Sequence, residues 1–182
     1  TSKYEKRGFA VSVPVWNKDT CTQCNQCASI CPHSVIRPFL MDAEETKKAP
    51  ASFVSLPAVG DELKGLNFRI QASPLDCTGC EVCVNVCPTQ SLKMEPLGSV
   101  KDVEGKNWDF AMTLTNKGDL VDKTTVKGSQ FQPPLIQFNG ACAGCGETQY
   151  VKMLTQLFGD RISFADAMGC TMVSLGGTGV VP

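Results

Sequence analysis

The chain has 182 residues, 42% of them hydrophobic, which is enough for one small domain and part of a second. Its 17 basic and 18 acidic residues give a formal net charge of −1, which argues against charge-driven binding of nucleic acid. No apolar run reaches the roughly 18 residues that span a membrane, so no membrane association is expected. Eleven cysteines in tight clusters indicate reduced thiolates rather than disulfides, and hence an intracellular, cytoplasmic protein.

The N-terminal stretch TSKYEKRGFA has neither an initiating Met nor the apolar segment of a signal peptide. It predicts a start that has been excised or processed. Residues 10–16, which begin at the alanine that ends this stretch, have the composition of a strand.

An internal repeat organises the first half of the chain. Both copies read C-x-x-C-x-x-C-x-x-x-C-P, the first from Cys21 and the second from Cys77. Expected strands precede them at residues 10–16 and 67–72, and apolar residues follow each copy. The repeat therefore predicts two strand–cluster–helix–strand halves related by a pseudo-twofold axis, an α+β ferredoxin-like fold.

The spacing of these cysteines is typical of domains that hold two [4Fe–4S] clusters. In such motifs three cysteines of a run bind one cluster, and the fourth, followed by Pro, reaches the cluster of the other run. Structural zinc is disfavoured, because zinc sites use two C-x-x-C pairs separated by about a dozen or more residues, whereas here three cysteines follow one another at every third position. We assign one cluster to Cys21, Cys24, Cys27 and Cys87, and the other to Cys31, Cys77, Cys80 and Cys83.

His33, the only histidine, directly follows Cys31 and Pro32. We expect a surface or packing residue rather than a ligand, because eight thiolates already fill the corners of two cubanes. Between the repeats, residues 32–76 form a stretch longer than a compact ferredoxin needs. The charged residues 42–48 within this insertion are expected to form a solvated loop, and the insertion to pack against a neighbouring domain.

The pattern changes after the second repeat. Residues 116–130 are polar and glycine-containing and predict a connector, closed by two prolines. Beyond it we expect a strand over 135–138, a Gly-rich turn, a helix over 148–158 and a strand over 161–165. We divide the chain into a ferredoxin-like domain (1–115), a linker (116–133) and the beginning of an α/β domain (134–182). One helix and two strands cannot bury a sheet, so this second domain is expected to be incomplete.

Three cysteines remain, and all lie in this last part. Cys142 and Cys145 form a C-x-x-C within NGACAGCGETQY, and Cys170 follows the expected strand 161–165, where α/β folds place ligands. A redox-active pair of the thioredoxin type is one interpretation of Cys142 and Cys145. The Ala-Gly between them and the presence of a third cysteine favour a further iron–sulfur cluster, whose fourth cysteine would lie beyond Pro182.

The motifs GACAGCGET and TVKGSQF (125–131), with the doubled cysteine motif, resemble the pyruvate:ferredoxin (flavodoxin) oxidoreductase family. The resemblance covers essentially the whole chain and implies that residues 134–182 begin a thiamine-diphosphate-binding domain. It also implies that Cys142, Cys145 and Cys170 bind a third [4Fe–4S] cluster, and that Glu147 and Cys170 face thiamine diphosphate. Residues 166–171, Asp-Ala-Met-Gly-Cys-Thr, depart from the Asn-Ala-Thr-Gly-Cys-Ser that family members usually carry.

The resemblance implies oxidative decarboxylation of pyruvate with coenzyme A to acetyl-CoA and CO₂. Electrons would pass from thiamine diphosphate, bound with magnesium, through the [4Fe–4S] clusters to ferredoxin or flavodoxin. No GDG…N motif for diphosphate and magnesium occurs in the chain, so the catalytic side chains and the coenzyme A site are expected elsewhere. The full-length enzyme is expected to be a homodimer, in the cytoplasm or in an organelle such as a hydrogenosome.

Two alternatives stay open. A relative that hands its electrons through a fused flavin domain to NADP explains the motifs equally well. A pure ferredoxin-like electron-transfer subunit explains the first eight cysteines but leaves GACAGCGET without a role.

Overall fold

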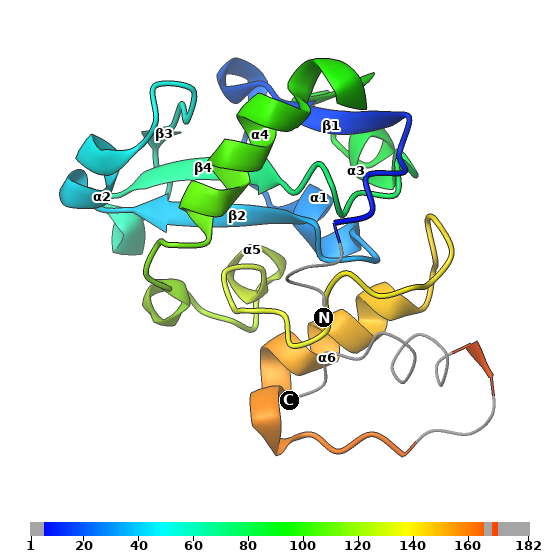
Figure 1. Cartoon of the computed structure of the whole chain (residues 1–182). Coiled ribbons are helices and arrows are strands. Elements are labelled where there is room, and N and C mark those ends of the chain that lie inside the picture. The colour runs from blue at the N-terminus through cyan, green and yellow to red at the C-terminus, as the bar shows by residue number, and fades with distance from the viewer. Residues whose placement is uncertain (1–5, 166–168, 171–182) are drawn as a thin grey trace.

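A computed structural model describes residues 6–165, 169 and 170 of the chain (Figure 1). Within them, the strands form a two-stranded sheet, β1–β5, and a three-stranded sheet in the order β2–β4–β3. The strands are β1 (Ser12–Trp16), β2 (Ile36–Met41), β3 (Leu56–Pro57), β4 (Asn67–Ala72) and β5 (Leu92–Pro96). The α-helices are α1 (Gln26–Ile30), α2 (Ala43–Lys48), α3 (Val82–Asn85), α4 (Leu97–Ala111), α5 (Val126–Ser129) and α6 (Thr148–Phe158). Short 3₁₀ turns are η1 (Lys18–Thr20), η2 (Asp61–Leu63), η3 (Gly118–Leu120) and η4 (Gly159–Arg161).

The two sequence repeats fold into matching halves that exchange strands. The order β1, α1, β2 of the first half is repeated as β4, α3, β5, and β1 pairs with β5 while β2 pairs with β4. Equivalent backbone hydrogen bonds continue both pairings. The N–H of Asn17 donates to Ser91 O over 2.8 Å, and that of Ser73 to Val35 O over 2.7 Å. This is the pseudo-twofold arrangement that the repeat predicts.

The hydrophobic core is shared by both halves and by the segment that follows them. Val13, Ile36 and Phe68, from β1, β2 and β4, are all fully buried. Trp16 packs edge-on against Phe68 with 6.2 Å between ring centroids, and Phe131 packs against the same ring at 6.3 Å. The predicted linker therefore supplies a side chain to the core of the first domain.

The insertion between the repeats is more ordered than expected. Residues 42–48 are not a solvated loop, because Ala43–Lys48 form α2 behind a capping box. In this box Asp42 accepts a hydrogen bond from the N–H of Glu45 over 2.8 Å, and Glu45 accepts one from the N–H of Asp42 over 3.1 Å. Phe53 of the insertion packs within the same domain, edge-on against Phe110 of α4 with 4.9 Å between ring centroids.

Helix α4 has no counterpart among the predicted elements. It crosses the face of the β2–β4 sheet (Figure 1) and is held there by tertiary contacts. Trp108 packs edge-on against Phe39 at 6.1 Å, and the Arg37 guanidinium lies 5.3 Å from the Trp108 ring centroid. Glu104 accepts a hydrogen bond from Gln71 over 2.7 Å. Because α4 contains two glycines and only a narrow buried face, local sequence gives little signal for it.

In the last part of the chain the predicted helix is confirmed and the two predicted strands are wrong. Helix α6 spans 148–158 as expected, but residues 135–138 and 161–165 contain no strand. The backbone groups of 135–138 bind elsewhere: Leu135 N–H donates to Thr155 Oγ1 over 3.2 Å, and Phe138 N–H to His33 O over 2.8 Å. In the described part of the chain, none of the helices has the length and apolar character needed to cross a membrane.

Glu45 ties α2 to the start of the linker. Its carboxylate accepts hydrogen bonds from Thr115 Oγ1 over 2.7 Å and from Lys117 Nζ over 2.5 Å. Partial burial would raise the pKa of Glu45, but the hydrogen bonds from Lys117, Thr115 and Asp42 outweigh it and lower the pKa to about 2. The stabilisation is therefore complete above the ordinary pKa of about 4.3 and is lost as the pH falls toward 2.

Glu45→Gln is expected to weaken the folded state around α2 by about 1–2 kcal/mol at neutral pH, since Lys117 loses its ionic partner. Glu44→Gln, at an exposed position in the same turn, is the matched control and should change stability little. Anaerobic amide hydrogen exchange of α2 compares the two variants. Equal protection of α2 in both would contradict the prediction.

Candidate metal centres

Two hollows in the structure each receive four cysteine side chains. The first, termed the Cys21 site, is lined by Cys21, Cys24, Cys27 and Cys87. The second, termed the Cys77 site, is lined by Cys31, Cys77, Cys80 and Cys83. Each site combines three cysteines of one repeat with the fourth cysteine of the other. The structure thus groups the side chains as crossed ligation predicts.

The cysteine loops take up the left-handed backbone conformation at equivalent positions of the two repeats. The related pairs are Gln23 and Gly79 (φ 58° and 68°), Asn25 and Glu81 (φ 60° and 64°), and Ser34 and Gln90 (φ 56° and 51°). This conformation costs a residue other than glycine roughly 1–2 kcal/mol. Five of the six positions bear that cost, so the tertiary structure must hold both loops in the same shape.

Backbone N–H groups point at cysteine sulfurs in both loops. Gln23 N–H donates to Cys21 Sγ, and Gly79 N–H donates to Cys77 Sγ, each over 3.4 Å. Hydrogen bonds to ligand sulfurs stabilise negative charge on them and help to set the reduction potential of a bound cluster. The two sites share this feature because the repeat places both donors two residues after the first cysteine.

The buried thiols require a positive charge to become thiolates together. Burial, followed by repulsion from Cys21 and Cys24, raises the pKa of Cys27 to about 12. Burial likewise raises the pKa of Cys77 to about 12 and also raises that of Cys83. Iron supplies the missing charge, and four thiolates are the ligand set of a [4Fe–4S] cluster. The residues present therefore fit such a cluster at each site.

Cys87, which is half-buried, differs from Cys27, Cys77 and Cys83. Burial alone would raise its pKa, but hydrogen bonds from the backbone N–H groups of Ser91 and Thr89 outweigh this effect and lower it. The Ser91 N–H donates to Cys87 Sγ over 3.2 Å. These hydrogen bonds therefore favour the thiolate form of Cys87, the one cysteine that the second repeat contributes to the Cys21 site.

Two further cysteines lie in the Gly-rich loop before α6. Cys142 is exposed and Cys145 is half-buried, and the N–H of Cys145 donates to Cys142 O over 3.0 Å in a tight turn. Burial would raise the pKa of Cys145, but N–H groups of Glu147 and Thr148 at the start of α6 lower it. The helix N-terminus thus favours a thiolate at Cys145.

This Gly-rich loop rests against the Cys77 site. A Cβ atom added at Gly144, where φ is +74°, would lie 3.6 Å from the Cβ of Cys80. The carbonyl of Pro32, next to Cys31, accepts hydrogen bonds from Asn139 Nδ2 and Thr148 Oγ1, each over 2.8 Å. The loop of Cys142 and Cys145 therefore adjoins the Cys77 site.

Cys170 and Glu147 are both exposed. Among residues 6–165, 169 and 170, no three side chains of His, Cys, Asp or Glu lie close enough to hold one metal ion. In a cubane each thiolate binds a different iron atom, so the sulfurs surround the cluster instead of meeting at one ion. A site shared by Cys142, Cys145 and Cys170 and faced by Glu147 stays a prediction.

His33 is a packing residue beside the Cys77 site. It is fully buried, and its Nδ1 lies 3.3 Å from the carbonyl oxygen of Asn139. Burial lowers the pKa of His33.

Sequence reasoning missed Lys152, whose buried ammonium reaches the backbone between the two sites. A lysine on the polar face of an amphipathic helix carries no signal that separates burial from solvation.

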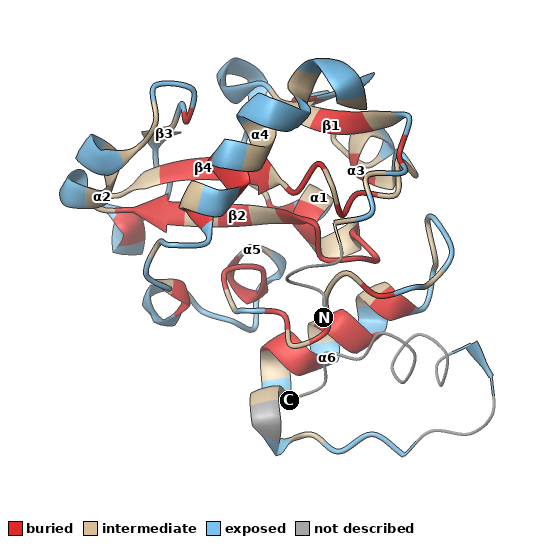
Figure 2. Cartoon of the chain, viewed as in Figure 1, coloured by how far each residue is buried: buried red, intermediate tan, exposed pale blue. Residues whose placement is uncertain are grey.

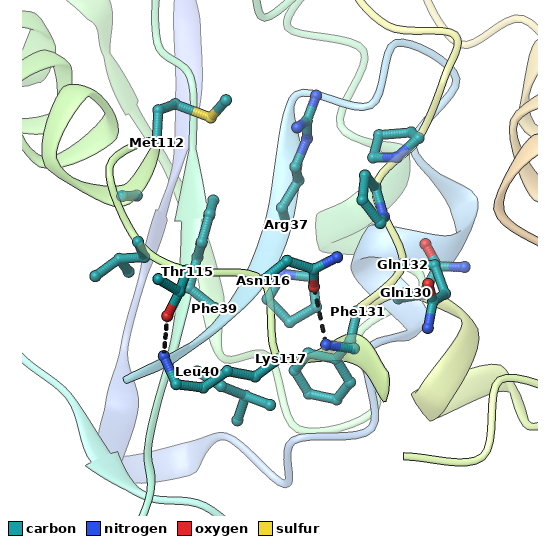
Figure 3. A pocket seen from close by; sticks show the side chains of 16 residues that line it. Arg37, Phe39, Leu40, Met112, Thr115, Asn116, Lys117, Gln130, Phe131 and Gln132 are labelled. Carbon is teal, nitrogen blue, oxygen red and sulfur yellow. Dashed lines mark hydrogen bonds between the residues drawn. The ribbon is translucent and has the colours of Figure 1, made fainter. Parts of the chain in front are cut away.

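A separate groove opens between β2, the end of α4 and residues 116–134 (Figure 3). Its lining is mostly apolar, none of the 16 lining residues is a cysteine, and its charged side chains are those of Arg37 and Lys117. Lys117 is already engaged by Thr115, over 2.7 Å, and by Glu45. The groove therefore brings together no set of metal-binding groups.

Comparison with known proteins agrees with this arrangement. Residues 20–91 match the family model of the 4Fe-4S dicluster domain. Over 182 residues the chain is 50% identical to the mitochondrial pyruvate dehydrogenase [NADP(+)] of Euglena gracilis, and it covers 10% of that protein. Over 175 residues, 95% of the chain, it is 53% identical to the pyruvate:ferredoxin oxidoreductase of Moorella thermoacetica and to the pyruvate-flavodoxin oxidoreductase of Enterobacter agglomerans, covering 15% of each.

Gly79→Ala is expected to destabilise the folded protein by about 1–2 kcal/mol, from the cost of a left-handed backbone alone. The new Cβ would also lie 3.0 Å from Ser12 O. Gly105→Ala in α4, where a Cβ meets nothing within 4 Å, is the matched control and should keep or raise stability. Anaerobic denaturation followed by cluster absorbance compares the two. Loss of stability in the Gly105 variant alone would refute the assignment of strain to position 79.

Cys31→Ser is expected to perturb the cluster of the Cys77 site, and Cys87→Ser that of the Cys21 site, because the fourth ligands cross between the repeats. EPR spectra of the reduced protein measure this. Cys80→Ser and Cys24→Ser serve as references that mark which signal belongs to which site. If Cys31→Ser altered the signal marked by Cys24→Ser, the crossed assignment would be wrong.

Proposed function

Because the chain belongs to the family of the pyruvate:ferredoxin and pyruvate-flavodoxin oxidoreductases, we propose that it is the electron-transfer segment of such an enzyme. The enzyme oxidatively decarboxylates pyruvate with coenzyme A to acetyl-CoA and CO₂, and its electrons leave to ferredoxin or flavodoxin. The chain spans 10–15% of the relatives described above, so the whole reaction involves much sequence outside it. The observation that carries the proposal is the placement of two four-cysteine sites beside a loop with two further cysteines.

In this proposal the Cys21 and Cys77 sites each hold one [4Fe–4S] cluster. Cys142, Cys145 and Cys170 are three ligands of a third, and its fourth cysteine comes from elsewhere in the protein. The lowered pKa of Cys145 and the closeness of Gly144 to Cys80, whose Cβ would lie 3.6 Å from a Cβ added at Gly144, support a cluster at this loop, adjacent to the Cys77 site. Electrons then pass from the third cluster to the Cys77 site and on to the Cys21 site.

Two short helices connect the Cys77 and Cys21 sites, the two ends of the last electron-transfer step. Cys27, in α1, belongs to the Cys21 site, and Cys31, the C-cap residue of the same helix, belongs to the Cys77 site. Helix α3 repeats this arrangement in the other half, with Cys83 inside it and Cys87 just after it. Two backbone segments, each with three residues between its cysteines, thus hold the two clusters at a fixed separation, which suits rapid electron transfer.

We further propose that residues 134–182 begin a thiamine-diphosphate-binding domain, with residues 116–133 as the linker from the ferredoxin-like domain (1–115). Helix α6 turns its buried, mostly polar face toward α1 and α5 (Figure 2). Tyr150, Leu154 and Phe158, spaced four residues apart, are 63%, 38% and 49% exposed. This outward apolar stripe is suited to be covered by the rest of such a domain.

Thiamine diphosphate, bound with magnesium, supplies the carbon nucleophile and the electron sink for decarboxylation. Of this chain, Glu147 and Cys170 are proposed to face it. The full-length enzyme is proposed to be a homodimer. The names of the relatives in Euglena gracilis and Cryptosporidium parvum, 50% and 52% identical, support NADP as a second candidate acceptor.

In the native protein, pyruvate with coenzyme A is expected to reduce all clusters. Cys170→Ala should leave the Cys21 and Cys77 clusters assembled and reducible by dithionite, at about eight iron atoms per chain. The reduction of these two clusters by pyruvate should slow by orders of magnitude, because the third cluster, which would pass electrons to them, lacks a ligand. Rapid-mix EPR measures this rate.

Reduction of the Cys170→Ala variant by pyruvate at the wild-type rate would show that Cys170 does not serve the first electron step. A wild-type protein that dithionite reduces but pyruvate does not would contradict the proposed substrate while leaving the clusters assigned. Steady-state assays with ferredoxin, flavodoxin and NADP as acceptors separate the two candidate enzymes.

A further inference from the structure

Lys152 places a cation in the interior, where α6 meets the cluster-binding domain. Its side chain is only 1% exposed. The ammonium donates hydrogen bonds to three backbone carbonyls: those of Ala28, of Ser29 over 2.9 Å and of Cys31 over 3.3 Å. Three acceptors match the three N–H bonds of an ammonium group. Burying the cation is therefore compensated by its full set of hydrogen bonds.

These carbonyls belong to the C-terminal end of α1. Helix ends leave carbonyl groups without intrahelical partners, and they carry partial negative charge that favours a cation. Helix α1 also connects the two metal centres, with Cys27 in the Cys21 site and Cys31 in the Cys77 site. The ammonium of Lys152 thus lies on the bridge between the two centres.

The ionisable groups that interact electrostatically with Lys152 include cysteines of both metal centres. Its electrostatic neighbours are Cys31, the guanidinium of Arg37 and Cys27, with the effect of Cys31 the largest. Arg37 is held by Ser34 O over 2.8 Å and by the side chain of Gln137, and it also acts on Cys31. Lys152 is thus a cation that acts on ligands of both sites at once, and on the Cys77 site more than on the Cys21 site.

We propose that the buried charge of Lys152 raises the reduction potentials of both clusters, and that of the Cys77 cluster more. Reduction adds one negative charge to a cluster, and a nearby cation in a medium of low dielectric constant stabilises that charge. Docking of α6 therefore helps to set the driving force along the electron path. This inference rests on the cluster assignment of the proposed function but not on the identity of the substrate.

Four substitutions in the native protein separate charge from packing. Lys152→Met removes the charge but keeps most of the side-chain volume, and Lys152→Gln removes the charge but keeps an N–H donor for the carbonyls. Lys152→Arg keeps the charge. Lys101→Met is the control, because Lys101 lies at an exposed position of α4, where solvent screens its charge.

Iron and sulfide analysis comes first, followed by anaerobic redox titration of each cluster monitored by EPR. We expect the Met and Gln variants to hold their full iron and to shift both potentials to more negative values, the Cys77 cluster by more. Lys152→Arg and Lys101→Met should keep the wild-type potentials.

Wild-type potentials in the fully loaded Met and Gln variants would overturn the inference. So would an equal shift in the Arg variant, which would assign the effect to packing. If both neutral variants lost their clusters while the Arg variant kept them, Lys152 would have only a structural role at the end of α1. That result would also overturn the inference. The titration uses dithionite and no pyruvate, so failure of the proposed substrate leaves the result unaffected. A wild-type protein without iron and sulfide would instead refute the cluster assignment itself.

Discussion

Four thiols gathered around one small hollow, at each of two sites, are the constraint on which the rest of this structure depends. As thiolates they repel one another, and burial raises the pKa values of Cys27, Cys77 and Cys83, so the protein alone favours their neutral forms. A bound iron–sulfur cluster supplies the positive charge that removes this conflict. Because each site takes three cysteines from one half and one from the other, cluster binding also joins the two halves, and metal binding and folding become one equilibrium.

The segment around Cys31 connects this metal-dependent core to the last part of the chain. Pro32 O accepts hydrogen bonds from Asn139 and Thr148, and Lys152 binds the carbonyls that precede and include Cys31 O. The same few residues thus carry a proposed cluster ligand and receive the Gly-rich loop and α6. A shift of α6 would change the hydrogen bonds and the charge next to Cys31, a proposed ligand of the Cys77 site. A movement of the proposed neighbouring domain could therefore affect the cluster there directly.

The motif TVKGSQF has a structural role that its composition hides. Thr125 caps α5 by accepting the N–H of Gly128 over 3.0 Å, and a Cβ at Gly128 would lie 2.0 Å from Asp122 O, so only glycine fits there. The carbonyl of Lys127 accepts a hydrogen bond from Asn25 Nδ2, over 2.9 Å, inside the Cys21 loop. This polar stretch, predicted as a connector, therefore braces one of the two metal centres.

Sequence alone determined the features that depend on local spacing. The cysteine repeat specifies the two matched halves and the crossed grouping of thiols, and apolar periodicity locates α6 at 148–158. Tertiary structure decided the rest. Residues 135–138 and 161–165 form no strand, since a strand exists only where a partner edge binds its backbone, and α4 exists because Trp108 and Glu104 find distant partners. Lys152 looks like any solvated helix lysine until α1 places three carbonyls around it, because burial of a charge is decided by the segment that covers it.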